Sequence, residues 1–199
     1  ELTGFYKYMD QLVSPTADPQ ASTLYQSVGT GQVVGGELLA RFDTQYVDGW
    51  LAYTISQSKR VDRPGEPERP FTFDQTHVLS FVIGFNPGDN WRIGARVRYS
   101  TGNPYTPLRA SYYDATNDVY VATAAAGLLS RRLDDFFQLD LRIDKTFFFD
   151  AWRLTVYLEV QNATNRANTE AVGYNYDYSE RDDINSLPII PSFGIRGSW

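Results

Sequence analysis

The stretch that decides the fold is Phe136-Phe137-Gln138-Leu139-Asp140-Leu141-Arg142-Ile143-Asp144-Lys145. From Phe137 onward, apolar and polar residues alternate strictly up to Asp144. Successive side chains of a β-strand point to opposite faces, so one face of this strand is apolar and the other is charged. After a turn at Asp150-Ala151, the alternation is repeated by Trp152–Gln161 and again by Phe193–Trp199.

Five further strands are predicted ahead of this stretch, and their positions are residues 1–13, Val33–Phe42, Trp50–Ser56, His77–Phe85 and Trp91–Ser100. The last of them alternates most clearly, with aromatic and aliphatic residues on one parity and Arg92, Arg96 and Arg98 on the other. The sequence therefore predicts about eight strands in an all-β chain. It contains no convincing amphipathic helix, although Ala122–Ala126 is compatible with a short helical turn.

The segments between these strands alternate in length. Three are short turns, at Asp43–Val47, Asn86–Asn90 and Asp150–Ala151. The other four connections are long and polar. The first begins at Ser14–Pro19, and the rest are Ser58–Pro70, Thr101–Leu133 and Asn165–Ser186. A soluble sandwich has no reason to alternate in this way, whereas a transmembrane barrel has short periplasmic turns and long extracellular loops. The pattern predicts an antiparallel transmembrane β-barrel whose apolar face meets lipid.

The composition agrees with this prediction and excludes other classes. Aromatic residues make up 15% of the chain, which suits β-structure and interfacial aromatic girdles. No run of about 18 apolar residues is present, so a transmembrane helix is excluded. The net charge of −6 argues against a nucleic-acid surface, and the absence of Cys excludes disulfides and thiolate metal sites.

The charged residues on the polar side of the predicted strands bear on the size of the barrel. The residues predicted to face the lumen include both signs of charge, and they are Arg92, Arg96, Arg98, Asp140, Arg142, Asp144, Arg153, Glu159 and Arg196. With Glu37 and Arg41 added, the basic groups outnumber the acidic ones. An eight-stranded barrel has room only for packed side chains, and each uncompensated buried ion costs on the order of several kcal/mol. A larger, hydrated or plugged barrel accommodates them more easily.

Three stretches resemble the barrel of TonB-dependent outer-membrane receptors. Leu158–Arg166 is similar to the penultimate strand of that family, Leu187–Arg196 to its closing strand, and Gly31–Leu38 to a Gly-rich run earlier in the barrel. The chain ends on Trp199, where the family usually has Phe. The resemblance implies a barrel of about 22 strands with an N-terminal plug domain. Residues 1–199 are then expected to be its C-terminal segment, with the plug and the N-terminal strands outside this sequence.

The resemblance also implies a location and a function. It places the chain in the bacterial outer membrane, as part of a receptor for uptake of a scarce nutrient such as a siderophore, cobalamin, a glycan or a peptide. The implied partners are lipid and lipopolysaccharide, the rest of the barrel and plug, a TonB-type energising complex, and the barrel-assembly machinery. The alternative from the residues alone is a self-contained eight-stranded barrel with a structural or adhesive role.

Two groups of residues are candidates for specific roles. Tyr174, Tyr176 and Tyr178 lie in the last long polar segment, where they are placed to contact a ligand at the barrel mouth. Phe193, Ile195 and Trp199 share the apolar parity of the final strand, which resembles the signal that barrel-assembly machinery reads.

Enzymatic and metal chemistry are not indicated. His77 is the only histidine, and no Ser or Asp partner is identifiable by spacing, so we predict no enzyme activity and no cofactor. Asp114, Asn117 and Asp118 supply oxygen ligands but lack the Gly and Glu of an EF-hand loop, so no metal site is predicted.

Overall fold

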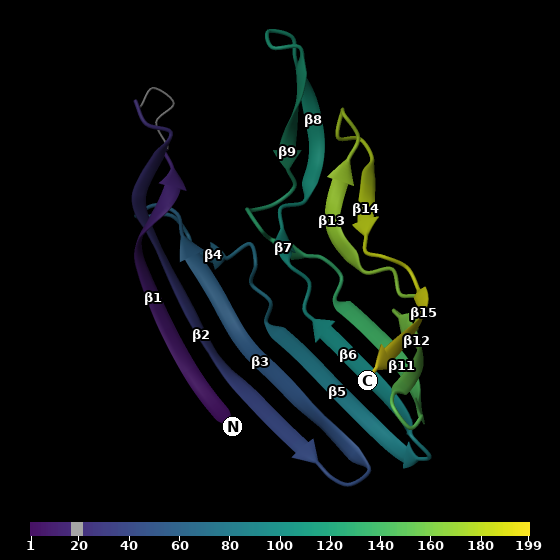
Figure 1. Ribbon diagram of the computed structural model, residues 1–199. Coiled ribbons are helices and arrows are strands. Elements are labelled where there is room, and N and C mark those ends of the chain that lie inside the picture. Colours follow the sequence, from purple (N-terminus) through teal and green to yellow (C-terminus); the bar gives the residue numbers. More distant parts are fainter. Residues whose placement is uncertain (17–21) are drawn as a thin grey trace.

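The structure is a computed structural model that describes residues 1–16 and 22–199, and these residues form strands, turns and connecting segments (Figure 1). No helix among them is long and apolar enough to cross a membrane. The strands in this part of the chain are β1 (Leu2–Pro15), β2 (Tyr25–Asp43), β3 (Val47–Val61), β4 (Arg69–Pro70), β5 (His77–Gly88), β6 (Trp91–Ser100), β7 (Pro104–Tyr105), β8 (Leu108–Asp114), β9 (Val119–Ala124), β10 (Arg131–Arg132), β11 (Phe136–Phe148), β12 (Arg153–Gln161), β13 (Thr169–Tyr174), β14 (Arg181–Asn185) and β15 (Ile190–Ser198).

One large sheet organises the molecule. Its strands lie in the order β1-β2-β3-β5-β6-β11-β12-β15, every neighbouring pair is antiparallel, and the short β4 adds to β3. These are the eight predicted strands, each paired with its neighbour along the chain. Figure 1 shows the short turns at the lower end of this sheet and two hairpins, β8–β9 and β13–β14, projecting from its upper end.

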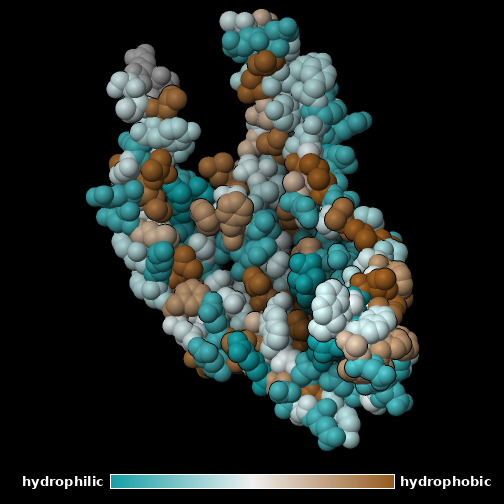
Figure 2. All heavy atoms as spheres, in the orientation of Figure 1, coloured by the Kyte–Doolittle hydropathy of each residue, from teal (hydrophilic) through white to brown (hydrophobic). Residues whose placement is uncertain are grey.

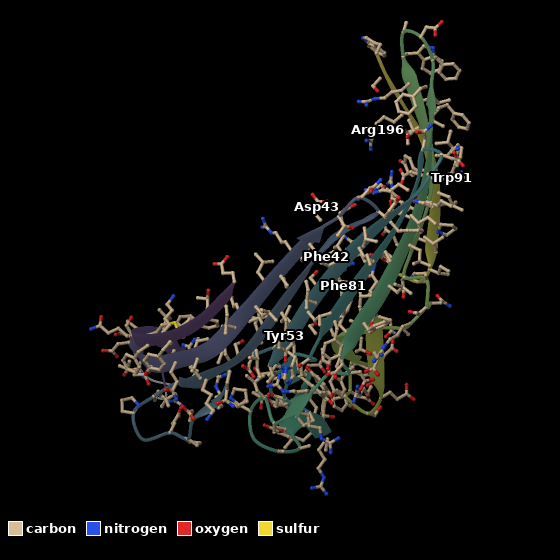
Figure 3. All side chains as sticks on the ribbon, turned by 90° about the horizontal axis from the view of Figure 1, so that it is seen from below. Phe42, Asp43, Tyr53, Phe81, Trp91 and Arg196 are labelled. Atoms are coloured by element: carbon tan, nitrogen blue, oxygen red, sulfur yellow. The ribbon has the colours of Figure 1, made fainter. Side chains whose placement is uncertain are left out.

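The register separates the apolar and polar side chains onto opposite faces. On β11, Leu141 lies between Ala95 and Val160 of the adjacent strands, whereas Asp140 lies opposite Arg96. In Figure 3 the sheet is strongly curved, and Arg196 lies on its concave side while Trp91 lies on the convex side. The predicted alternation of charge and apolar residues is therefore an alternation between the two faces of one curved sheet.

Among the described residues, no second layer packs on this sheet. None of the hydrophobic side chains among the described residues is fully buried, and the apolar face leaves residues such as Leu141, Ile143 and Leu158 between 37% and 47% exposed. A soluble sandwich would bury this face against a second sheet. An apolar face without a protein partner is what a lipid-facing barrel wall requires.

The sheet is open in this structure. Among the described strands, β1 and β15 occupy its two edges, and each is paired in the large sheet only with β2 and β12, respectively. The structure therefore does not have the closed eight-stranded arrangement that the self-contained alternative requires. The chain forms part of a barrel wall.

The three short turns are defined by local backbone geometry and hydrogen bonds. Between β2 and β3, the Thr44 amide donates to the Val47 carbonyl at 2.8 Å. Between β5 and β6, Asp89 and Asn90 have φ angles of 49° and 61°. Two consecutive positive φ angles are those of a type I′ hairpin turn, which matches the twist of the strands and favours Asn and Asp. Between β11 and β12, the Phe149 amide donates to the Trp152 carbonyl at 2.8 Å.

The predicted strand ends are wrong in most places, although Trp91–Ser100 coincides with β6. Strand β2 begins at Tyr25 rather than Val33, β3 runs to Val61, β11 to Phe148, and β15 begins at Ile190. Trp152 and Trp199 lie just outside β12 and β15. Hydrogen bonding to neighbouring strands extends these elements into sequence where the alternation is weak.

The predicted long loops contain strands of their own. The segment Thr101–Leu133 carries β7, β8, β9 and β10, and the segment Asn165–Ser186 carries the hairpin β13–β14. The helical turn with which Ala122–Ala126 is compatible does not form over residues 122–124, because residues 119–124 pair with β8. Of the loop predicted to begin at Ser14, residues 14 and 15 extend β1, and residues 17–19 lie outside the described part of the chain.

Candidate functional site

The first candidate surface is the concave face of the large sheet, which we call the polar face. It carries Arg92, Arg96 and Arg98 on β6 and Asp140, Arg142 and Asp144 on β11, in matching register. Figure 2 shows this side of the molecule to be hollowed, with hydrophilic side chains along its middle and the hairpin regions standing above it. The sequence predicted these residues to share one face, and the pairing of β6 with β11 brings them together.

Asp140 is the most enclosed charge on the polar face. It is 6% exposed, and its carboxylate accepts hydrogen bonds from Arg96 at 2.7 and 2.9 Å and from the Gln138 amide at 2.7 Å. The backbone amide of Asn162 donates to it at 2.9 Å. Because an enclosed carboxylate is stable only when its oxygens are hydrogen-bonded, these donors fix both its charge and its orientation.

Arg142 joins two strands across the polar face. Its guanidinium pairs with Asp144 of the same strand at 2.7 Å and with Glu159 of β12 at 3.0 Å. It also lies over the ring of Tyr157, with 4.0 Å from Cζ to the ring centroid. The combination of two carboxylates and an aromatic face holds this side chain flat against the sheet.

Arg92 reaches in the other direction, over a glycine. Its guanidinium pairs with Asp48 of β3 at 2.7 Å, passing across β5 at Gly84. A Cβ on Gly84 would lie 2.4 Å from the Arg92 Nη2 atom, so a larger residue there would require the guanidinium to shift. Sequence analysis identified Arg92 but missed Asp48, because the pairing depends on how β3, β5 and β6 are aligned.

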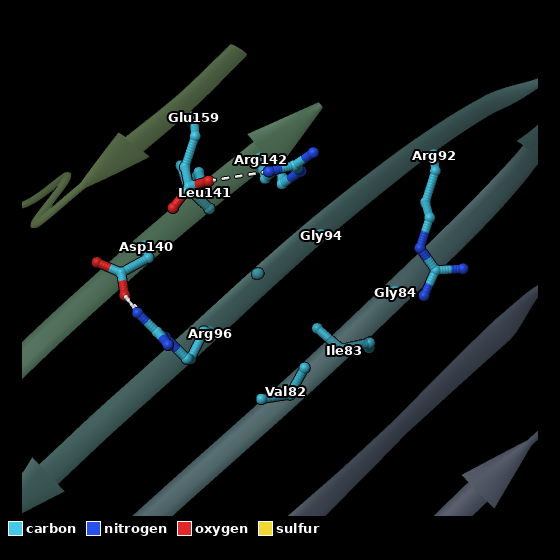
Figure 4. Close-up of a pocket in the computed structure, with 11 residues that line it drawn as sticks. Val82, Ile83, Gly84, Arg92, Gly94, Arg96, Asp140, Leu141, Arg142 and Glu159 are labelled. Carbon is cyan, nitrogen blue, oxygen red and sulfur yellow. Dashed lines mark hydrogen bonds and ion pairs between the residues drawn. The ribbon is translucent and has the colours of Figure 1, made fainter. Parts of the chain in front are cut away.

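A shallow cavity lies between these arginines. It has a volume of about 260 Å³, its floor includes Gly84 and Gly94, and Arg92, Arg96 and Arg142 stand around it (Figure 4). Figure 4 marks the ion pairs of Arg96 with Asp140 and of Arg142 with Glu159. Each arginine around the cavity therefore has a carboxylate partner, and the wall is close to electrically balanced there.

The remaining predicted residues occupy the flanks of the polar face. Arg98 donates to Gln138 at 2.7 Å and lies 5.7 Å from the centroid of the Phe136 ring. Arg153 donates to the Ser198 hydroxyl at 2.6 Å, at the end with the short turns. Arg196 of β15 lies opposite Thr155 of β12. These contacts are spread along the sheet and form no single constellation.

Asn162 connects the polar face to the segment that follows β12. It is 3% exposed and has a φ of 48°, a left-handed conformation that Asn tolerates better than most residues. Its side-chain amide donates to the carbonyls of Arg166 and Leu187 at 3.0 and 3.2 Å. The role of this residue within Leu158–Arg166 is thus to turn the chain away from the sheet while holding Asp140.

The second candidate surface is formed by the two hairpins above the sheet. The Ser111 hydroxyl of β8 donates to the Asp177 carbonyl in the loop between β13 and β14, and the Leu108 amide donates to the Tyr174 hydroxyl at 3.3 Å. Arg181 donates to the Tyr105 hydroxyl at 3.1 Å. These hydrogen bonds join segments about 66 to 76 residues apart in sequence, so the two hairpins support each other.

Tyrosines from both hairpins surround an open cavity of about 630 Å³. Its lining residues are Tyr113, Asp118, Val119, Tyr120, Tyr176 and Tyr178. The ring centroids of Tyr113 and Tyr120 are 5.3 Å apart, and those of Tyr120 and Tyr176 are 5.1 Å apart with their planes nearly perpendicular. We call this set the tyrosine cavity.

The three predicted ligand tyrosines have different positions. Tyr176 and Tyr178 line the tyrosine cavity, and Tyr176 is 80% exposed. Tyr174 does not line it; it braces the two hairpins through its hydroxyl. Tyr113 and Tyr120 were not predicted, and their only signal was an aromatic cluster inside a polar segment. Asp118 was considered only as a metal ligand.

Hydrogen bonds raise the pKa of two of the phenols in the tyrosine cavity. A hydrogen bond to the Asp118 carboxylate raises the pKa of Tyr113 above its usual value. A hydrogen bond with Tyr120 raises the pKa of Tyr176 in the same way. At neutral pH the rings of Tyr113 and Tyr176 are therefore uncharged, and Asp118 is the carboxylate of the lining.

A buried carboxylate holds the base of the β8–β9 region to the sheet. Asp74 is 3% exposed, and it accepts the Ser58 amide at 2.5 Å and the guanidinium of Arg132. Arg132 also donates to the Gly102 carbonyl at 3.1 Å. This junction fixes the segment after β6 against β3 and the loop before β5.

The predicted assembly residues lie on the edge strand β15. Phe193 and Ile195 pair with Leu158 and Val156 and are 71% and 67% exposed, and Trp199 beyond the strand is fully exposed. Nearby, the rings of Phe149 and Trp152 stack at 4.4 Å. Aromatic side chains therefore gather at the end of the sheet that carries the short turns.

The sequence has two adjacent pairs of carboxylates, Asp134-Asp135 and Asp182-Asp183, and one member of each pair binds protein groups. Asp135 accepts the Tyr99 hydroxyl at 2.7 Å and the Gly102 amide at 3.1 Å, and Asp183 pairs with Arg181 at 2.6 Å. Within the described ranges, no group of three or more His, Cys, Asp or Glu residues is arranged to hold a metal ion.

Comparison with known proteins identifies the family. A family model described as "TonB dependent receptor-like, beta-barrel" matches residues 1–163, which span β1 to β12 and the turn that follows. No curated protein matches the chain. The matched family consists of transporters rather than enzymes, and its members act with TonB in the bacterial outer membrane. The open, one-layered sheet with an apolar convex face and a charged concave face has the architecture of that barrel. The chain belongs to the family of TonB-dependent receptor β-barrels.

Proposed function

We propose that the chain forms the C-terminal segment of a TonB-dependent receptor that imports a scarce nutrient, with the plug and the preceding strands of a barrel of about 22 strands supplied by other sequence. The observation that carries this proposal is the open sheet of eight strands, the first seven of which lie within the residues that the family model matches. Strands β1 and β15 each have a free edge for the remaining wall.

In this proposal the polar face lines the lumen. Arg92, Arg96, Arg98, Asp140, Arg142, Asp144, Arg153, Glu159 and Arg196 form a hydrated wall that faces the plug and the passing nutrient. The ion pairs of Arg96 and Arg142 support this role, because a balanced wall does not trap charged solutes at one point. The convex face lies in lipid, with lipopolysaccharide around its outer part.

The hairpins β8–β9 and β13–β14 stand at the extracellular mouth in this proposal, since long connections are extracellular in such barrels. Tyr176 and Tyr178 contact the ligand there, and Tyr174 holds the hairpins together. Phe193, Ile195 and Trp199 act at the opposite end, as the segment that the barrel-assembly machinery recognises. Their exposure on an edge strand supports that role, because a recognition segment must be accessible before the barrel closes.

The proposal is tested by growth and uptake. Cells lacking the receptor are compared with wild-type cells on media limited in iron, cobalamin, glycan or peptide, and a selective growth defect identifies the nutrient. Uptake of that nutrient is then measured with the Tyr176→Ala receptor and with TonB inactivated. We expect uptake to fall in both cases. Equal growth of both strains on every medium, or uptake independent of TonB, would contradict the proposal.

A further inference from the structure

We propose that the tyrosine cavity binds an organic cation, such as the alkylammonium or guanidinium group of a peptide or other small ligand. The proposal rests on the proposed uptake function and narrows its ligand class. It is carried by the lining of the cavity, which offers four tyrosine rings and one carboxylate and no basic side chain.

The rings provide the first part of the argument. Tyr113 and Tyr120 come from β8 and β9, and Tyr176 and Tyr178 come from the loop between β13 and β14. The face of an aromatic ring is electrically negative, and several rings around one space attract a cation that has shed part of its water. Because Tyr176 is 80% exposed, its ring is available to a ligand without any rearrangement of the hairpins.

The outer parts of the two hairpins carry acidic residues and no basic ones. Residues 110–130 and 167–180, which include the outer parts of both hairpins, contain no Lys, Arg or His. The acidic residues of the same two ranges are Asp114, Asp118, Glu170, Asp177 and Glu180. An anionic ligand would be repelled by the carboxylates of this region, and a neutral ligand would gain no charge attraction from them. A cation is attracted by both the rings and the carboxylates.

The backbone keeps the lining in place. Asp118 and Tyr178 both have left-handed conformations, with φ of 54° and 59°. A tyrosine in this conformation is a genuine outlier that costs on the order of 1 kcal/mol or more, and such residues are concentrated at binding sites. The turn that carries Tyr178 is closed by a hydrogen bond from its amide to the Asn175 carbonyl at 3.1 Å.

The test compares probes that differ in charge but not in shape. Binding to the intact receptor in detergent is measured by calorimetry and by saturation-transfer NMR. The probes are choline, its neutral isostere 3,3-dimethylbutanol, a neutral oligosaccharide (maltotetraose) and an anion (citrate). We expect choline to bind more tightly than its neutral isostere, with saturation transfer to its methyl groups.

Variants locate the site. We expect Tyr176→Ala to weaken choline binding about 2- to 25-fold, the range for loss of one cation–π contact. Asp118→Asn is expected to weaken it about 2- to 5-fold. The matched control is Tyr112→Ala, because Tyr112 is an exposed tyrosine of β8, in the hairpin that carries Asp118, and does not line the cavity. Heat-dependent electrophoretic mobility confirms that each variant is folded.

The outcomes separate this inference from the uptake function. Equal binding of choline and 3,3-dimethylbutanol, or binding of maltotetraose or citrate instead of choline, would overturn the cation assignment. A loss of uptake in Tyr176→Ala cells, with no choline binding to the wild-type receptor, would overturn the cation assignment and leave the uptake function supported. Choline binding that depends on Tyr176, with uptake unaffected by Tyr176→Ala, supports the cation site and contradicts its role in uptake.

Discussion

Two adjacent residues of β5 provide a direct test of which face meets lipid. Val82 and Ile83 are both partly exposed β-branched residues near the middle of the strand. Val82 pairs with Trp50 and Arg96 and lies on the polar face, whereas Ile83 pairs with Gly49 and Ala95 and lies on the apolar face. Replacing each with Lys places the same charge, one residue apart, on opposite sides of the wall.

The expected magnitudes differ because the surroundings differ. A lysine on the lipid face near the bilayer midplane costs about 2–4 kcal/mol, which lowers the folding constant about 30- to 1,000-fold. Lys at position 82 faces the hydrated side, where the neighbouring Arg96 is 44% exposed and already paired with Asp140. Repulsion across water between such groups amounts to roughly 1 kcal/mol or less.

Folding into phospholipid vesicles measures this difference. Tryptophan emission reports insertion, and the fraction that resists unfolding by SDS reports the folded barrel at increasing urea. We expect Ile83→Lys to lower the urea midpoint strongly and Val82→Lys to leave it within a small margin of wild type. If Val82→Lys were as damaging as Ile83→Lys, or more so, the assignment of the two faces would be refuted.

Two further predictions concern single ion pairs. Asp140→Asn removes the charged partner of Arg96 and should cost about 1–2 kcal/mol, less than for a fully buried pair because Arg96 is 44% exposed; a denaturant midpoint equal to wild type would contradict this. Hydrogen bonds from Arg69 lower the pKa of Asp62 in the folded protein. The stability that this pair contributes is therefore fully present above the unfolded pKa of about 3.9, and it is lost as the pH falls through the lower folded pKa. Hydrogen exchange of amides 60–70, corrected for the intrinsic rate, should therefore rise below about pH 4 in wild type, and an identical rise in Asp62→Asn would argue against the pair as its cause.

The alternation of side chains predicted the part of the sheet that crosses the membrane. Within Trp91–Ser100 one face must be apolar and the other polar, so the pattern is strict and the predicted ends were correct. Beyond the bilayer both faces meet water, and the pattern disappears while the hydrogen-bonded pairing continues. That is why the first eight residues of β2, from Tyr25 to Gln32, were missed.

The sequence pattern predicted which residues of the candidate sites share a face of the sheet, but not their partners on other strands. Parity placed Arg96, Asp140 and Arg142 on one face, and the structure shows them there. The partner of Arg92 was missed because Asp48 is two strands away, across Gly84. Tyr174 joins the two hairpins, whereas Tyr176 lines the tyrosine cavity. This difference depends on how two hairpins from distant parts of the sequence meet, and no local pattern contains that information.

The length of the second strand has a consequence for how a ligand first meets the protein. A strand of a membrane barrel needs about 9–11 residues to cross the hydrocarbon layer, and β2 has 19. The residues of β2 beyond those that span the membrane, together with the outer part of β3, form a hydrogen-bonded sheet that projects above the lipid surface on this side of the molecule. Molecules arriving from the medium would touch hydrogen-bonded sheet well before they reach the level of the acyl chains.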